Sequence, residues 1–167
     1  MSRTNEGTPV TILSPFLWFD QNAEEAANFY VSIFPDSRIT RVTRYPEGAP
    51  MPAGTAFGVS FVLDGLEFQA LNAGPQFPFT EAISFFTQVT TQEEVDYYWN
   101  ALLAGGGTES RCGWLKDRFG LSWQVVPSQL DEVLGGSDPD GAARAMSAMM
   151  GMRKIVIAEL EAAYRGD

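Results

Sequence analysis

The sequence predicts an α+β fold in which one order of elements, a strand, a helix and then further strands, occurs twice and is followed by a helical tail. Three observations lead to this prediction. Apolar residues alternate in several short segments, two capping-box patterns each precede an apolar helix face, and the same order of elements returns at residue 82. Identity between the halves is weak, so the repeat is one of pattern. With 167 residues, 45% of them hydrophobic, the chain is large enough for one domain, expected at 8–167.

The first module, expected at about 11–72, begins with a strand candidate at 11–19, TILSPFLWF. The pattern Asn22-Ala-Glu-Glu25 then indicates a capping box at the start of a helix that ends at Pro35. The apolar face of this helix is formed by Ala23, Ala26, Ala27, Tyr30 and Phe34. Three strands follow at 38–45, 56–63 and 66–72, and Asp64-Gly65 joins the last two as a hairpin.

The second module, expected at about 82–127, repeats this order. A strand at 82–89 precedes a second capping box, Thr91-Gln-Glu-Glu94, and a helix that ends at three glycines, 105–107. The apolar face of the helix is formed by Val95, Tyr98, Trp99, Leu102 and Leu103. Closing strands are expected at 108–111, 112–116 and 121–126, with Asp117 capping the turn between the last two.

The tail, at about 128–165, is predicted to be helical. Asp138-Pro139 has the form of a cap followed by a first-turn proline, and Gly151 interrupts the helix before a shorter one at 155–164. The tail carries more apolar side chains than a solvated appendage would keep, namely Met146, Met149, Met150, Ile155, Ile157 and Leu160. Apolar surface of this extent usually marks an interface, so we expect a homodimer with the tail at its seam. The alternative is a tail that folds back over its own sheet.

Composition excludes several classes of function. The formal net charge is −10 and the pI about 4.4, and no basic stripe is visible, so nucleic acid is not an expected partner. No apolar run reaches the length of a membrane span, and residues 1–7 are too polar for a signal peptide, so no membrane association is expected. Cys112 is the single cysteine, which excludes an intrachain disulfide and favours a reducing cytoplasmic location.

The chain contains no histidine, which excludes Ser-His-Asp and Cys-His catalysis and every metal site built on imidazole. Proton transfer would have to use carboxylates, Lys, Tyr or Cys112, and we expect Cys112 to be a buried, inert thiol because nothing activates it. The glycines at 105–107 follow a helix, whereas phosphate-binding glycines follow a strand. No other segment has the strand–glycine-loop–helix start of a Rossmann-like cofactor site, so no nucleotide cofactor is expected.

Five segments resemble the PhnB-like family, often labelled 3-demethylubiquinone-9 3-methyltransferase, within the vicinal oxygen chelate superfamily. They are PFLWFDQNAEEAANFY (15–30), FPDSRI (34–39), EFQALNAGP (67–75), CGWLKDRFGLSWQVVP (112–127) and IVIAELEAAY (155–164). The superfamily includes glyoxalase I, extradiol dioxygenases and bleomycin-resistance proteins. The resemblance implies paired βαβββ modules whose curved sheets enclose a cleft, usually in a homodimer.

The resemblance also implies where a metal would bind, because metal-dependent members place one ligand on the first and one on the last strand of each module. Carried over by strand pattern, the four positions are Ser14, Gln69, Ser84 and Gln124. Two hydroxyls and two amides leave a divalent cation without charge compensation, so we expect neither a metal nor another cofactor. These residues become candidate ligand contacts, although the two glutamines would also be explained if they satisfied each other.

Strand alternation adds further candidates for ligand binding. In 121–126, Trp123 and Gln124 face opposite ways, so Trp123 is expected beneath a helix. Trp18, Phe86 and Trp114 share cleft-facing parity and would stack on a planar ligand, with core packing as the alternative for each. Glu67 shares the parity of Gln69 and is the first carboxylate to inspect for catalysis. Asn72 is interpreted as a turn residue before Gly74-Pro75.

These observations predict a glyoxalase-like protein that binds a small, partly apolar or aromatic molecule in a metal-free cleft. Two alternatives remain open at this point. One is a small-molecule enzyme, namely a lyase, an isomerase or the methyltransferase of the family label. The other is a drug-sequestering protein of the resistance kind, whose acidic surface would attract a cationic compound.

Overall fold

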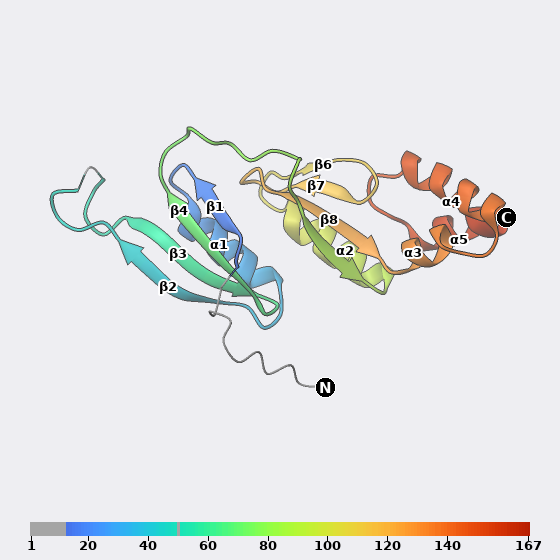
Figure 1. Cartoon of the computed structure of the whole chain (residues 1–167), viewed down its shortest axis with the longest axis horizontal. Coiled ribbons are helices and arrows are strands. Elements are labelled where there is room, and N and C mark those ends of the chain that lie inside the picture. The colour runs from blue at the N-terminus through green and yellow to red at the C-terminus, as the bar shows by residue number, and fades with distance from the viewer. Residues whose placement is uncertain (1–12, 50) are drawn as a thin grey trace, which may run out of the picture. The chain divides into compact units, whose positions relative to one another are not determined.

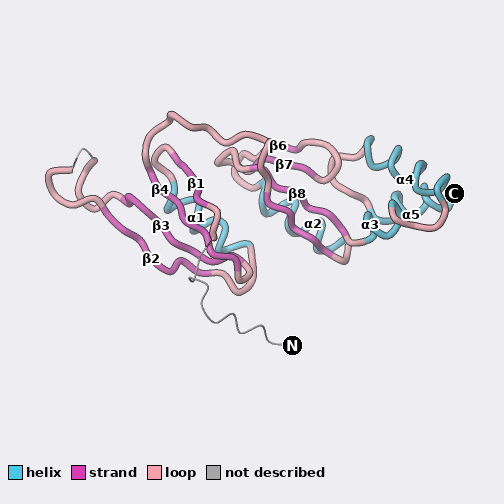
Figure 2. Tube along the Cα trace, in the orientation of Figure 1, coloured by secondary structure: helices cyan, strands magenta, loops and turns pink. Residues whose placement is uncertain are grey.

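The computed structural model describes residues 13–49 and 51–167, and the α+β prediction is confirmed. The chain divides into two compact units, one ending at Gln76 and the other running from Phe77 to Asp167. Each contains a four-stranded mixed sheet with one long helix along a single face (Figures 1 and 2). The part of the predicted first strand at 11–12 and the start of the predicted domain at 8–12 lie outside the described residues.

The first unit has the strand order β1-β4-β3-β2, with β1 parallel to β4 and the other pairs antiparallel. Its elements are β1 (Phe16–Phe19), α1 (Ala23–Ile33), β2 (Arg38–Arg44), β3 (Ala56–Leu63) and β4 (Leu66–Asn72). β1 begins later than predicted, at Phe16, because Pro15 has no N–H to donate to a ladder. Its carbonyl still accepts a hydrogen bond from the Gln69 amide nitrogen at 2.9 Å, so the chain enters the sheet through Pro15.

The start of α1 corrects the predicted capping box. The Asn22 side chain makes no capping hydrogen bond. Instead Asn72, at the end of β4, accepts from the Ala23 backbone N–H at 2.8 Å and donates to the Ala56 carbonyl at 2.9 Å. Asn72 is only 3% exposed, so it is a buried bridge between the helix and two strands rather than a turn residue. Orphan N–H groups at a helix start accept any suitably placed oxygen, including one from a strand distant in sequence.

The second unit repeats the topology, with strand order β5-β8-β7-β6 and β5 parallel to β8. Its elements are β5 (Phe85–Val89), α2 (Gln92–Leu103), β6 (Thr108–Glu109), β7 (Trp114–Lys116) and β8 (Ser122–Pro127). The predicted capping box is confirmed, since Thr91 accepts from the Glu94 N–H and the Glu94 side chain accepts from the Thr91 N–H. β7 begins at Trp114 because Cys112 and Gly113 have φ of 57° and 81°, outside the range of a strand.

The tail forms three helices packed on the second unit. They are α3 (Gln129–Leu134), α4 (Pro139–Gly151) and α5 (Ile157–Arg165), and the Asp138 side chain caps α4 as predicted. A small core holds them together, made of Val126, Leu130, Val133, Ala145, Ile155 and Leu160. Ile155 and Leu160 are fully buried there, whereas Met146 and Met150 stay 43% and 55% exposed. The tail therefore folds back onto its own chain for its most buried apolar residues, and the predicted dimer seam would have to use what is left.

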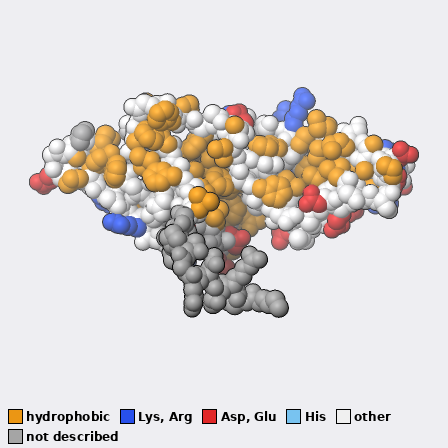
Figure 3. Space-filling model, viewed as in Figure 1, with side chains coloured by type: hydrophobic (Ala, Val, Ile, Leu, Met, Phe, Trp, Pro, Cys, Tyr) orange, Lys and Arg blue, Asp and Glu red, His pale blue; other side chains and the backbone are white. Residues whose placement is uncertain are grey.

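Two further points concern the whole described chain. No helix in the described ranges is long and apolar enough to cross a membrane. Cys112 is half-buried rather than buried as predicted, because its left-handed backbone turns the side chain to the surface, where Sγ lies 3.8 Å from Sδ of Met150. Hydrophobic side chains are visible over both sheets and over the tail helices in Figure 3.

Candidate functional site

The first sheet has one face covered by α1 and one open face. Phe61 and Phe68 stack on each other on the covered face, where Phe61 also packs against Tyr30 of α1. Because side chains alternate along a strand, the neighbours of Phe68 in β4, Glu67 and Gln69, lie on the open face. The parallel register places Phe16 beside Gln69 and Trp18 beside Leu71. We call this surface the first open face.

Hydrogen bonding on the first open face differs from the predicted pattern in its partner. Gln69 Oε1 accepts from Ser60 Oγ at 2.7 Å, and Ser60 is the register partner of Gln69 on β3. Ser14 precedes β1 and is half-buried, so it lies on the approach to the strand rather than within it. The Trp18 indole N–H donates to the Gly74 carbonyl at 2.8 Å, which fixes the ring. Glu67 is exposed.

The second sheet brings four of the predicted residues together on the face turned away from α2. Gln124 in β8 lies between Phe86 of β5 and Trp114 of β7, since both are its register partners. Its Nε2 donates to Ser84 Oγ at 2.8 Å. Phe86 is 54% exposed and Trp114 half-buried, so core packing does not account for Phe86. We call this surface the second open face.

Trp123 confirms the direction of the alternation. It is 2% exposed, packs on Phe85 and donates its indole N–H to Asp117 Oδ2 at 2.9 Å. Asp117 Oδ1 also accepts from the backbone N–H groups of Phe119 and Leu121, at 2.8 and 3.1 Å. Asp117 is therefore the predicted turn cap, buried on the opposite side of the strand from Gln124, and does not serve as an acid or base in the site.

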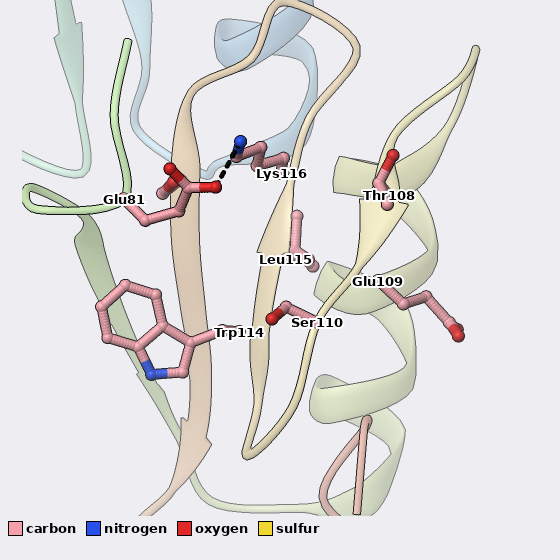
Figure 4. A pocket seen from close by; sticks show the side chains of 8 residues that line it. Glu81, Thr108, Glu109, Ser110, Trp114, Leu115 and Lys116 are labelled. Atoms are coloured by element: carbon pink, nitrogen blue, oxygen red, sulfur yellow. Dashed lines mark ion pairs between the residues drawn. The ribbon is translucent and has the colours of Figure 1, made fainter.

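A cavity of about 250 Å³ lies on the second open face beside Trp114. We call it the unit-two cavity. It is lined by Glu81, Thr108, Glu109, Ser110, Trp114, Leu115, Lys116 and Ser122 (Figure 4). Glu81 and Lys116 point toward one another and form an ion pair. The register aligns Thr108, Lys116 and Ser122 across β6, β7 and β8, so the three share this face.

The two carboxylates that line the cavity are in different electrostatic settings. The hydrogen bond from Lys116 lowers the pKa of Glu81, which keeps this carboxylate ionised. The pKa of Glu109 is lowered by hydrogen bonds from the Trp99 indole and Arg153, both at 3.2 Å. These bonds hold the Glu109 carboxylate away from Trp114 and Glu81, as Figure 4 shows. The charged groups that remain for a ligand are therefore Glu81 and Lys116.

Ser122 is the least satisfied polar residue of the cavity. It is 1% exposed, and its Oγ hydrogen-bonds no atom of the described ranges. A buried hydroxyl without a partner costs about 1–3 kcal/mol on protein scales, and most buried hydroxyls therefore have one. An unsatisfied donor in the lining of a cavity is available to a bound molecule.

The first unit also contains a cavity, of about 350 Å³, at the ends of β1 and β4. Its polar side chains are largely occupied. The Asn72 amide bridges Ala23 and Ala56, and the Tyr45 hydroxyl donates to the Asn72 carbonyl at 3.2 Å. This cavity carries none of the eight residues predicted from the sequence. The unit-two cavity, which contains Trp114, is the better candidate.

The residues do not fit a divalent metal. The four implied positions carry only serine and glutamine, and the two amides already hydrogen-bond serines of their own units. Hard divalent cations in proteins require anionic oxygen ligands, which this set lacks. Within residues 13–49 and 51–167, no group of three or more His, Cys, Asp or Glu side chains is placed to hold a metal.

Sequence reasoning missed several residues of the site. Ser122 has the parity of Gln124, two positions away, and that signal was available. Glu81 and Lys116 meet only through the fold, and the sequence pairs Lys116 on paper with Asp117, which is engaged elsewhere. Ser60 emerges only from the β3–β4 register.

Two mixed sheets of equivalent topology, each covered by one helix, define a paired βαβββ protein of the vicinal oxygen chelate superfamily. The chain belongs to the 3-demethylubiquinone-9 3-methyltransferase family, whose model matches residues 11–126. Helices α3 to α5 lie beyond this match. No curated protein matches the chain.

Solved structures agree with this assignment. A putative 3-demethylubiquinone-9 3-methyltransferase, PhnB protein, from Bacillus cereus is 34% identical, with a TM-score of 0.65 over 71% of this chain and 100% of that one. Protein PA1353 from Pseudomonas aeruginosa is 22% identical, with a TM-score of 0.57 over 71% and 98% of the two chains. The fosfomycin resistance protein FosX from Mesorhizobium loti is 11% identical, with a TM-score of 0.54 over 75% and 98%. The last two similarities show the fold alone.

Proposed function

We propose that this protein binds a small, partly apolar or aromatic molecule on its open sheet faces, without a metal ion. One observation carries the proposal. Gln124 stands between Phe86 and Trp114 in the register of the second sheet, and a cavity of about 250 Å³ adjoins Trp114. Small-molecule sites combine apolar and aromatic walls with a few polar groups that fix orientation, and this surface has both.

Tryptophan fluorescence and ligand-observed NMR test the proposal with a defined panel of probes: indole, quinoline, catechol and 4-hydroxybenzoate. At least one probe is expected to bind, and Phe86→Ala and Trp114→Ala should each weaken its binding about tenfold, the size of one lost aromatic contact of about 1.5 kcal/mol. Tyr97→Ala is the matched control, because Tyr97 is an exposed aromatic of α2 with 52% exposure against 54% for Phe86. Binding that survives both site variants, or that falls equally in the control, contradicts the proposal.

A second candidate function is an enzyme that uses an organic base, as a lyase or isomerase would. The observation that favours it is the Glu81–Lys116 pair in the unit-two cavity. The lowered pKa of Glu81 suits a base rather than an acid, because the carboxylate stays ionised. Incubation of carbonyl compounds with the protein in D₂O would test it. Deuterium incorporated next to the carbonyl by the wild type but not by Glu81→Gln supports this function, and equal incorporation by both removes Glu81 from it.

Assembly and location complete the proposal. The exposed Met146 and Met150 of α4 are the apolar surface that a second copy would cover in a homodimer. The single half-buried thiol, Cys112, is compatible with a reducing cytoplasm.

A further inference from the structure

We propose that the unit-two cavity binds a zwitterion of the α-amino-acid type, with its carboxylate on Lys116 and Ser122 and its ammonium on Glu81. The proposal rests on the proposed function and names the ligand class of the same open face. Three properties of the cavity lead to it, namely the balance of its charges, its unsatisfied hydroxyl and its size.

The charge balance favours a ligand with both signs. Lys116 and Glu81 pair with each other, and their side chains are 38% and 64% exposed, so the pair is easily opened. A ligand with one negative charge would take Lys116 and leave Glu81 without a partner, in a protein whose net charge is already −10. A ligand with one positive charge would leave Lys116 without a partner. A zwitterion replaces each charge of the pair and leaves both side chains satisfied.

The hydroxyl groups favour a carboxylate close to the sheet. Ser122 is the register partner of Lys116, and both are on the second open face. Its buried Oγ hydrogen-bonds no atom of the described ranges, so its donor is available to an acceptor that enters the cavity. An anionic oxygen that bridges Lys116 and Ser122 gains two hydrogen bonds, at least one of them charge-assisted. Ser110 and Thr108, which also line the cavity, are exposed and offer further polar contacts (Figure 4).

The cavity also limits the rest of the ligand. Its volume of about 250 Å³ is below the range of roughly 300–1,000 Å³ typical of pockets for drug-sized molecules. The Trp114 ring borders the cavity on the side of Glu81, as Figure 4 shows. An apolar side chain packed on this indole fits the remaining space, and an ammonium held by Glu81 would lie close to an aromatic face that attracts cations. A metabolite of amino-acid size meets these conditions.

Four probes that share one apolar part test the proposal by calorimetry: L-phenylalanine, 3-phenylpropionate, 2-phenylethylamine and 3-phenylpropanamide. L-Phenylalanine, which carries both charges, is expected to bind at least about tenfold more tightly than each of the others, since each charged contact contributes roughly that factor. Equal affinity for all four probes overturns the zwitterion proposal. If that shared affinity falls in Phe86→Ala, the proposed function stands by itself, and failure of all four probes together with the aromatic panel rejects both.

Substitutions assign the two charges. Lys116→Met should weaken L-phenylalanine and 3-phenylpropionate about tenfold and leave 2-phenylethylamine unweakened. Glu81→Gln should weaken L-phenylalanine about tenfold and strengthen 3-phenylpropionate, because Lys116 is then released from its pair. Lys154→Met is the matched control, since Lys154 pairs with Asp96 outside the cavity and is 33% exposed. Affinities that do not change in Lys116→Met and Glu81→Gln, or that change equally in the control, overturn the assignment.

Discussion

Replacing Ser122 with alanine should stabilise the protein, because it removes a buried hydroxyl that hydrogen-bonds no atom of the described ranges. Leaving such a group unsatisfied costs about 1–3 kcal/mol. The residue is 1% exposed, so alanine leaves a void of only one oxygen atom and loses a small part of that gain in dispersion contacts. We expect the free energy of unfolding to rise by about 1 kcal/mol, which corresponds to a Tm increase of roughly 2–4 °C for a chain of this size.

Urea denaturation followed by tryptophan fluorescence measures this change, because Trp99 and Trp123 are both buried in the same unit as Ser122. The midpoint should rise while the slope with denaturant stays constant. Ser60→Ala is the matched control. The Ser60 hydroxyl donates to Gln69 Oε1 at 2.7 Å, so its loss should lower stability by about 1 kcal/mol. Opposite signs for the two variants are the expected result.

A Ser122→Ala variant as destabilised as Ser60→Ala would refute the reasoning, because it would mean that the Ser122 hydroxyl is satisfied in the folded protein. The stabilised variant should also bind L-phenylalanine several-fold more weakly, since a charge-assisted hydrogen bond to the ligand is lost. Higher stability with lower affinity separates a binding residue from a merely structural one.

Four other predictions follow from the structure. Elemental analysis of the purified protein should find no stoichiometric zinc, nickel, iron or manganese, because the implied ligand positions are neutral; about one metal per chain would contradict this. Calorimetric titration with S-adenosylmethionine should show no saturable binding, since the chain lacks a strand–glycine-loop–helix start; micromolar affinity would refute the expectation. Light scattering should give a dimer mass for the full chain and a monomer mass after Met146→Glu and Met150→Glu, and a monomeric wild type would reject the dimer. Asn72→Ala should lower stability by about 2 kcal/mol, because the N–H of Ala23 and the carbonyl of Ala56 lose their partner, and an unchanged urea midpoint would show that the bridge contributes nothing.

Much of the fold was predictable from local pattern. The order of elements, the repeat and the capping box at Thr91 are confirmed, because apolar periodicity and caps depend on residues a few positions apart. The same rule of alternation placed Trp123 and Gln124 on opposite faces, and Phe86 beside the open one. Among the predicted site residues, this local rule was sufficient wherever a strand is regular.

The errors have a common physical origin, since each concerns an interaction between segments distant in sequence. Asn22 has the form of a cap, yet Asn72 caps the helix because the β1–β4 pairing brings its side chain to the first turn. Cys112 was expected to be buried, and its position is set by a left-handed backbone before β7. The tail has the composition of an interface, but Ile155 and Leu160 are used in its own core.

The sequence by itself thus determined which side chains alternate onto the open faces and that those faces lack histidine and a carboxylate set for a metal. Only the tertiary structure decided which of them meet. The pairing of Glu81 with Lys116 and the isolation of the Ser122 hydroxyl depend on strand register and on the path of the segment before β5. A register is set by the packing of the whole sheet, and the sequence of one strand does not contain it.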